Sequence, residues 1–131
     1  MTESLEDTAY DRLGGDPVLR ALVNRFYRNM DELPECVGLR RMHALDLQGA
    51  EDKLFKFLSG WLGGPNLYWQ EFGHPRLRMR HLPFSIGAAE RDQWLICMRM
   101  ALDSEISDED LRQRLFAAFV QTANHMINRA E

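Results

Sequence analysis

The sequence predicts an all-α protein whose four main helices form two crossed pairs, with one long functional loop between them. Apolar residues recur at intervals of three and four in four separate segments, which is the pattern of helices that bury one face. Residues 35–64 and 84–131 contain no proline, so long helices fit in both stretches. By contrast, residues 64–84 hold three of the five prolines and are too irregular for a long helix.

The first long helix is expected to begin at Asp16-Pro17 and to end before Pro34. Aspartate can cap the first free N–H groups of a helix, and proline suits the first helical position. The residue before a proline disfavours helical geometry, which places the end of the helix. The paired glycines 14 and 15 are expected to end a short helix that precedes it. The apolar face of the long helix comprises Leu19, Leu22, Val23, Phe26, Tyr27 and Met30.

The second long helix is expected over residues 47–62, because Gly63-Gly64-Pro65 cannot continue it. The third is expected to start near Ser85, which would cap it, and to end near Asp103. The apolar face of the second comprises Leu47, Ala50, Leu54, Phe57, Leu58 and Trp61. That of the third comprises Trp94, Cys97, Met98, Ala101 and Leu102.

The fourth long helix is expected to start at Ser107 or Asp108. Acidic residues occupy positions 108–110, which suits the positive end of a helix dipole. Leu67 and Trp69 hint at a short strand in the irregular segment 64–84, although the chain offers no partner strand. A loop of this length in a small domain is usually functional. The apolar face of the fourth helix comprises Leu111, Leu115, Ala118, Phe119, Thr122 and Met126.

Length and charge restrict the classes of function. The 131 residues fit a single domain over 1–131, in which residues 1–8 are expected to be a flexible N-terminal extension. The net charge of −4 argues against a nucleic-acid partner, which requires a basic surface. Arg76, Arg78 and Arg80 form a local basic cluster, for which a single small anion is the more economical partner.

Cysteine usage and the N-terminus indicate a cytoplasmic protein. Cys36 and Cys97 are too few for a disulfide framework, so both are expected to be reduced thiols. The acidic N-terminus lacks the basic start and apolar stretch of a signal peptide. The longest apolar run, residues 115–120, is too short to span a bilayer, so no membrane association is expected.

Polar groups on apolar faces are the clearest sign of a ligand site. Tyr27 and Trp94 lie on the apolar faces of the first and third helices, and each carries one polar group that needs a partner when buried. His81 lies at the edge of the irregular segment. Taken singly, each of these residues is more simply read as part of the core or the surface. The four histidines show no zinc-motif spacing, and no hydrolase or transferase pattern is present.

The combination of motifs resembles the group II truncated haemoglobins over about residues 8–128. The most specific segment is the run Gly-His-Pro-Arg-Leu-Arg-Met-Arg-His at 73–81, which Trp94 follows thirteen positions after His81. Further matching segments are Tyr-Asp-Arg-Leu-Gly-Gly at 10–15, Arg-Phe-Tyr at 25–27, Leu-Gln-Gly-Ala-Glu at 47–51, Gly-Gly-Pro at 63–65, Pro-Phe at 83–84 and Glu-Arg-Asp-Gln-Trp-Leu at 90–95.

The resemblance implies a truncated globin fold, a two-on-two helical sandwich around haem b, with His81 as the iron ligand. The second ring nitrogen of His81 is then expected to bond to a backbone carbonyl. On the opposite, distal side, Tyr27 and Trp94 would donate hydrogen bonds to a bound ligand. His43 would be a third polar group that reaches the ligand or Tyr27, the alternative being an exposed loop histidine.

Further residues receive roles from the same resemblance. Ala50 stands where larger globins have a distal histidine and would leave an opening for ligand entry, while Leu54 would limit the pocket. Phe26 and Phe57 would contact the haem, or they are simply core residues. The haem propionates would be bound by either Arg78 or Arg80, because arginine binds carboxylates bidentately. Tyr68 is a candidate helper in that interaction.

The function expected from the resemblance is reversible binding of dioxygen, carbon monoxide and nitric oxide at ferrous haem. Storage, sensing and scavenging all fit, whereas a pocket that holds oxygen tightly is poorly suited to oxygen transport. One alternative is a haem peroxidase or nitric-oxide dioxygenase, and the latter would need a separate reductase for sustained turnover. Another is a haem-free helical interaction module. Either a monomer or a homodimer is compatible with the sequence.

Overall fold

The computed structural model describes residues 8–128, which form α-helices and one 3₁₀ helix and contain no strand. None of the helices within this range is long and apolar enough to cross a membrane. The elements in chain order are α1 (Ala9–Leu13), α2 (Gly15–Glu32), the 3₁₀ helix η2 (Pro34–Cys36), α3 (Val37–Arg41), α4 (Gln48–Trp61), α5 (Leu67–Phe72), α6 (Leu77–His81), α7 (Ala88–Glu105) and α8 (Glu109–Met126).

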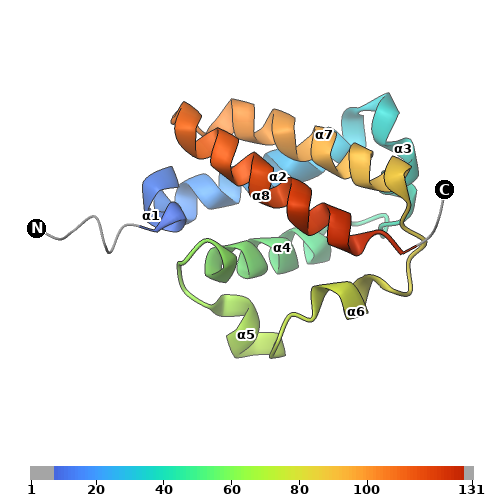
Figure 1. The fold of residues 1–131 in the computed structure, drawn as a ribbon, viewed down its shortest axis with the longest axis horizontal. Helices are drawn as coiled ribbons and strands as arrows, with labels where there is room; N and C mark the ends of the chain where they lie inside the picture. The colour runs from blue at the N-terminus through green and yellow to red at the C-terminus, as the bar shows by residue number, and fades with distance from the viewer. Residues whose placement is uncertain (1–7, 129–131) are drawn as a thin grey trace, which may run out of the picture.

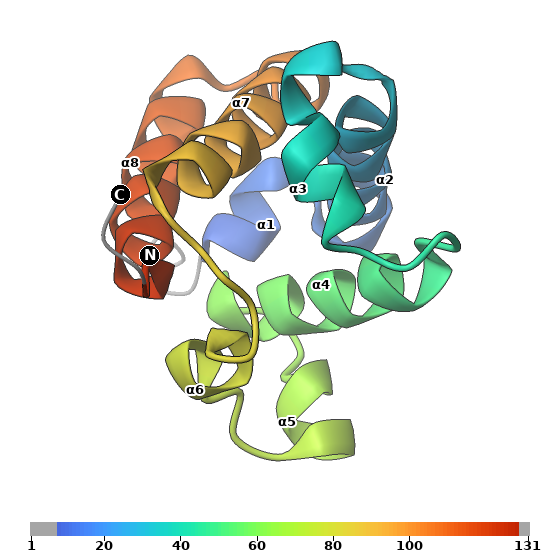
Figure 2. The same cartoon turned by 90° about the vertical axis from the view of Figure 1, so that its right-hand side faces the viewer.

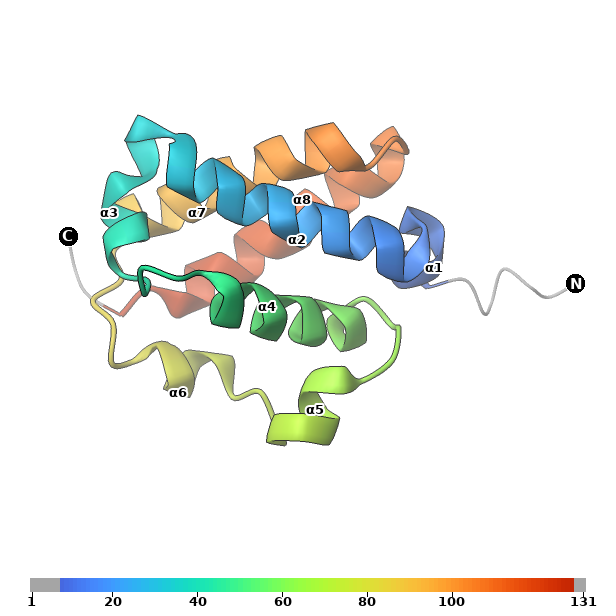
Figure 3. The same ribbon diagram turned by 180° about the vertical axis from the view of Figure 1, so that it is seen from behind.

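Two antiparallel helix pairs make up the body of the protein, which confirms the predicted all-α, two-on-two architecture. Helix α2 runs antiparallel to α4, and α7 runs antiparallel to α8 (Figures 1 and 3). The pairs meet where α2 crosses α7 in close contact. Helices α5 and α6 lie on the far side of α4, away from α2 and α7 (Figure 2). The segment from α6 to α7 therefore passes along one side of the molecule.

The apolar face of α2 is buried as predicted, but its N-terminal cap is not Asp16. The N-cap is Gly14, whose φ of 118° falls in the left-handed region that favours glycine. Asp16 instead lies inside the first turn and pairs with Arg20 one turn later, at 3.2 Å. The helix ends before Pro34, at an extended Leu33, as the proline requires. The predicted extension over residues 1–8 lies outside the described range except for Thr8, whose hydroxyl caps α1.

Helix α7 begins at Ala88, so the prediction that Ser85 caps it was wrong. The N–H of Gly87 donates to Glu90 Oε1 at 2.8 Å, which closes the first turn from within. The residues before it are held by Asn128, whose Oδ1 accepts from the Ile86 N–H at 2.9 Å and whose Nδ2 donates to the Phe84 carbonyl at 2.8 Å. These bonds tie the chain to the end of α8 and keep it out of the helix.

The irregular segment contains two short helices, α5 and α6, and not the suggested strand. Helix α5 packs against α4 and buries Tyr68, and the Lys56 ammonium on α4 bonds to Glu71 on α5. Packing against α4 thus overrides the weak strand preference of Leu67 and Trp69. Helix α6 follows Arg76, which has a φ of 46°. A single-turn helix of this kind has no periodicity that a sequence can reveal.

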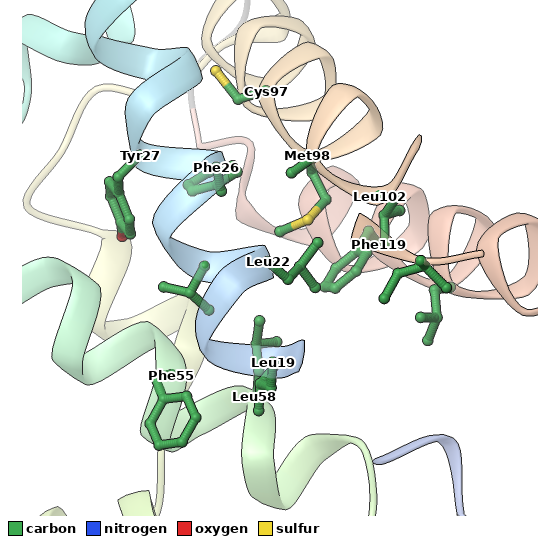
Figure 4. Packing of buried hydrophobic residues seen from close by; sticks show 14 of the residues in the cluster. Leu19, Leu22, Phe26, Tyr27, Phe55, Leu58, Cys97, Met98, Leu102 and Phe119 are labelled. Carbon is green, nitrogen blue, oxygen red and sulfur yellow. The ribbon is translucent and has the colours of Figure 1, made fainter. Parts of the chain in front are cut away.

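The core lies between α2, α7 and α8, where Leu22, Phe26, Met98 and Phe119 converge (Figure 4). Cys36 and Cys97 are buried free thiols, as expected, and their Sγ atoms lie 3.3 Å apart. Helix α4 differs from the other long helices, because most of its predicted apolar face is only half-buried. The half-buried members are Leu47, Ala50, Leu54, Phe57 and Trp61.

Candidate functional site

A cavity of about 240 Å³ lies beside the apolar face of α4 and accounts for the half-burial of Leu54, Phe57 and Trp61. It lies between α4, α6, α7 and α8 and reaches α2 and the loop after α3. Most of its wall is apolar, with a few polar side chains among the aliphatic and aromatic ones, which is the usual composition of a cofactor site. The lining comprises Tyr27, Leu39, Met42, His43, Leu54, Phe57, Leu58, Trp61, Leu77, His81, Phe84, Ile86, Glu90, Arg91, Trp94, Phe119, Thr122, Ala123 and Met126.

His81 closes α6 and contributes its imidazole to the cavity wall. Its Nδ1 lies 2.7 Å from the carbonyl oxygen of Leu77, one turn earlier. A carbonyl can only accept, so Nδ1 carries the proton and Nε2 carries the lone pair. This is the form in which neutral imidazole binds a metal, with the second ring nitrogen fixing the ring. A backbone carbonyl, here that of Leu77, is the partner expected for the second ring nitrogen of an iron-binding histidine.

Tyr27 is buried on α2 and lines the cavity; its ring meets that of Phe26 edge-on, and its hydroxyl is directed toward α4 (Figure 4). Its hydroxyl donates to the Ala50 carbonyl at 3.4 Å, a long and therefore weak hydrogen bond. Burial, with a smaller contribution from the nearby Glu51 carboxylate, raises the pKa of the Tyr27 phenol well above its ordinary value. The phenol therefore stays protonated and can serve as a donor at neutral pH.

Trp94 lies on α7, where its ring packs against Phe26 and Phe119 with centroid separations of 5.0 and 5.6 Å. These contacts hold the indole at the cavity wall. Within residues 8–128, no group accepts a hydrogen bond from the indole N–H, and no fully buried side-chain nitrogen or oxygen lacks a partner. The Trp94 N–H is thus available to a group inside the cavity.

His43 follows α3 and is half-buried in the same cavity wall, so it is not an exposed loop histidine. Its Nδ1 lies 3.0 Å from the Leu39 carbonyl, and its ring meets Tyr27 edge-on at 6.0 Å between centroids. Burial is the main cause that lowers the His43 pKa, and the charges of Arg40 and His81 lower it further, against the opposing effect of the Leu39 carbonyl. His43 is therefore neutral at pH 7, and its Nε2 is an acceptor.

The other predicted site residues divide between the cavity and its surroundings. Leu54 and Phe57 line the cavity, whereas Phe26 is fully buried behind Tyr27 and Trp94. Ala50 contributes its carbonyl to Tyr27 and does not belong to the lining. These differences arise because a helix turns by about 100° per residue, so neighbouring members of one apolar face point into different compartments.

The two candidate arginines have different surroundings. Arg78 donates from Nη1 to the carbonyls of His125 and Ile127, at 2.6 and 3.1 Å, and so ties α6 to the end of α8. The Arg80 guanidinium lies 5.7 Å from the ring centroid of Tyr68. Apart from a 3.5 Å contact with the His74 carbonyl, no group in the described part of the chain accepts from it. Arg80 thus keeps most of its donors for another partner.

Several lining residues carry no prediction from the sequence. Five of them stand on predicted apolar faces, so helical spacing could have indicated them but could not distinguish cavity from core: Leu58, Trp61, Phe119, Thr122 and Met126. The rest lie in short or irregular segments or on the polar side of a helix, where spacing carries no signal. These are Leu39, Met42, Leu77, Phe84, Ile86, Glu90, Arg91 and Ala123.

A two-on-two fold with a histidine and the polar groups of Tyr27, His43 and Trp94 around one apolar cavity defines a globin-like cofactor-binding protein. A family model for bacterial-like globins matches residues 8–128, so the chain belongs to this family, as a group II truncated haemoglobin. The family implies a haem cofactor. The cavity fits such a group, because its apolar wall contains an imidazole that presents Nε2 and is fixed through Nδ1.

Individual relatives agree with this assignment. Group 2 truncated hemoglobin YjbI of Bacillus subtilis (strain 168) is 40% identical over 117 residues, which cover 89% of this chain and 86% of the relative. The structure of a group II 2-on-2 hemoglobin from Agrobacterium tumefaciens superimposes with a TM-score of 0.92 at 46% identity, covering 95% of this chain and 96% of that one. The structure of a truncated oxygen-avid haemoglobin from Bacillus subtilis superimposes with a TM-score of 0.84 at 38% identity, covering 93% of this chain and 100% of that one.

Proposed function

We propose that this protein binds dioxygen and other diatomic ligands reversibly at ferrous haem b, with His81 as the iron ligand. The observation that carries the proposal is the arrangement of one cavity. An imidazole with Nδ1 held by the Leu77 carbonyl shares that cavity with the Tyr27 hydroxyl and the Trp94 N–H. The similarity to a haemoglobin described as oxygen-avid supports the same ligand class.

Ferrous haem, when bound, supplies the reversible binding of diatomic gases and gives dioxygen a partial negative charge. The protein contributes the donors that stabilise this charge. Tyr27 and Trp94 lie in a mostly apolar wall, where a hydrogen bond is stronger than in water. Both donors are fixed by packing against Phe26, so little reorganisation is required.

The two donors are not equivalent. Tyr27 has a single O–H, which already donates to the Ala50 carbonyl, and its ring faces that of His43, where Nε2 is a further candidate acceptor. Trp94 has no such competitor among the described residues. We therefore infer that Trp94 is the principal donor, and that neutral His43 acts as an acceptor that directs the Tyr27 hydroxyl.

At the edge of the haem, we propose that Arg80 and Tyr68 bind a propionate. Arg80 lies against Tyr68 and keeps most of its guanidinium donors for a carboxylate. Arg78 is the weaker candidate, because one of its nitrogens already serves two carbonyls at the end of α8.

Absorption spectra of the purified protein test the central assignment. We expect a strong Soret band that shifts on reduction and again under carbon monoxide, at one haem per chain. His81→Ala should lose haem or bind it weakly, whereas His74→Ala, which changes an exposed loop histidine, should retain it. A colourless protein that takes up no added haemin, or a His81→Ala variant with normal haem content and spectrum, would overturn the proposal.

A further inference from the structure

We propose that Gln93 is a positioning residue for the distal side of the cavity, because it holds His43 in the orientation and protonation form of a hydrogen-bond acceptor. The inference rests on the proposed function of the cavity. Gln93 does not itself line the cavity, and its action on His43 passes through Leu39.

The first contact joins α7 to the start of α3. The Leu39 N–H donates to Gln93 Oε1 at 2.7 Å. Leu39 is the third residue of α3, and the first N–H groups of a helix have no carbonyl partner within that helix. No side chain of the preceding residue caps α3. Gln93 therefore supplies, from a distant part of the chain, the cap that α3 lacks locally.

The second contact joins the same residue to His43. The Leu39 carbonyl accepts from His43 Nδ1 at 3.0 Å, and the Leu39 side chain is buried and lines the cavity. This bond places the proton on Nδ1 and leaves Nε2 as an acceptor. A movement of Leu39 would break the bond and free His43 to take the opposite tautomer, which can donate from Nε2.

The neighbourhood of Gln93 is shaped for this contact. A Cβ added to Gly38 would lie 3.3 Å from Gln93 Oε1 and 3.4 Å from Nε2, which is too close without displacing the amide. The Cys36 thiol donates to the Gln93 backbone carbonyl at 3.6 Å, so the segment that leads into α3 is attached to Gln93 at two points. Glycine at position 38 thus allows α3 to approach the amide closely.

Gln93 also precedes Trp94 in the sequence. The same turn of α7 therefore carries the Trp94 donor and the amide that holds His43 in place through Leu39. The indole of Trp94 is a donor without a competing acceptor among the described residues, and the amide of Gln93 holds, through Leu39, the imidazole whose ring meets that of Tyr27 edge-on. A shift of α7 would move both groups together. This arrangement explains why a side chain outside the cavity should influence how tightly the ligand is held.

The ring nitrogens of His43 provide the direct test. In the wild type, ¹⁵N NMR of the carbon monoxide form should show His43 protonated at Nδ1 alone. Gln93→Leu should give a mixture of tautomers, Gln93→Glu should keep the wild-type pattern because it retains an acceptor, and Gln113→Leu, an exposed control on α8, should change nothing. The His43 measurement also works on protein without haem, so failure of the proposed function would not hide the result.

Oxygen release links the contact to function. Gln93→Leu should slow dioxygen dissociation by several-fold, because His43 then releases the Tyr27 proton or donates one itself. In a His43→Leu background, the same substitution should have no effect. Wild-type tautomers in Gln93→Leu, or an equal effect on release with and without His43, would overturn the proposal. Unchanged tautomers combined with normal haem binding would leave the proposed function standing while this inference fails.

Discussion

At the scale of single residues, the cavity wall combines two donors, Tyr27 and Trp94, with one acceptor, Nε2 of His43. Trp94 can donate, neutral His43 can accept at Nε2, and Tyr27 has one proton, which the Ala50 carbonyl already accepts. The raised pKa of Tyr27 and the lowered pKa of His43 both follow mainly from burial. Burial thus keeps the distal groups uncharged, so the charge on a ligand is met by dipoles rather than by ions.

The unequal position of the two donors leads to a prediction on ligand release. Trp94→Phe should accelerate dioxygen dissociation by roughly tenfold or more, because a lost hydrogen bond of about 1.5 kcal/mol corresponds to about that factor. Tyr27→Phe should have a smaller effect, since the Tyr27 hydroxyl already donates to the Ala50 carbonyl. Stopped-flow measurement of dissociation on both variants gives the comparison.

An unchanged rate in Trp94→Phe would mean that the indole serves only as packing against Phe26 and Phe119. Phenylalanine retains most of that packing, so haem content provides the control for a loss of structure. A larger effect in Tyr27→Phe than in Trp94→Phe would reverse the ranking and show that the Tyr27 proton belongs to the ligand alone.

Sequence patterns identified the residues that stand on periodic faces, but they could not assign them to core or cavity. Tyr27 and Trp94 both line the cavity, whereas Phe26, on the same face as Tyr27, is buried behind them. Spacing alone cannot separate these cases, because the cavity is formed by several helices together. Gln93 is harder still, since its partner Leu39 is 54 residues away in the sequence.

At the scale of elements, helix lengths followed from periodicity, and errors gathered at helix ends. The start of α7 was misplaced because Asn128, distant in sequence, holds the preceding residues. Helices α5 and α6 were missed as helices because each is too short to show a repeat. By contrast, the start of α8 was predicted, since its cap is local: the Asp108 carboxylate accepts from the Leu111 N–H at 3.1 Å.

This local cap makes the stability of α8 dependent on pH. The Leu111 N–H and then the Arg12 guanidinium lower the pKa of the Asp108 carboxyl below its ordinary value. A depressed folded-state pKa contributes stability above the unfolded-state pKa, and this contribution is lost as the pH falls through the folded value. Asp108→Ala should therefore lower Tm at neutral pH. The difference in Tm between the wild type and this variant should become smaller below about pH 4.

Thermal unfolding of the wild type and of Asp108→Ala between neutral pH and pH 3 measures how this difference in Tm depends on pH. Asp103→Ala is the matched control, because Asp103 is an exposed carboxylate with a 3.7 Å contact to Arg112 and does not cap a helix. If Asp108→Ala lowered Tm by the same amount at every pH measured, the cap would act without the charge of the carboxylate.

At the scale of the whole molecule, the fold is built around a space that its own side chains do not fill. The apolar faces of α2, α7 and α8 meet in a packed core, while Leu54, Phe57 and Trp61 on α4 stay half-buried beside the cavity. Apolar surface left open in this way costs about 25 cal/mol per Å². A haem that covers these side chains would recover part of that free energy, so cofactor binding and folding should be linked.

The linkage predicts that haem raises the thermal stability of the protein. A ligand present at a thousandfold excess over its Kd stabilises the folded state by about 4 kcal/mol, on the order of 10 °C in Tm for a chain of this size. Adding haemin to haem-free protein should raise Tm by this order, and His81→Ala should lose most of the increase while His74→Ala keeps it. If haemin left the wild-type Tm unchanged, the half-buried face of α4 would need another explanation, and the link between cavity and cofactor would fail.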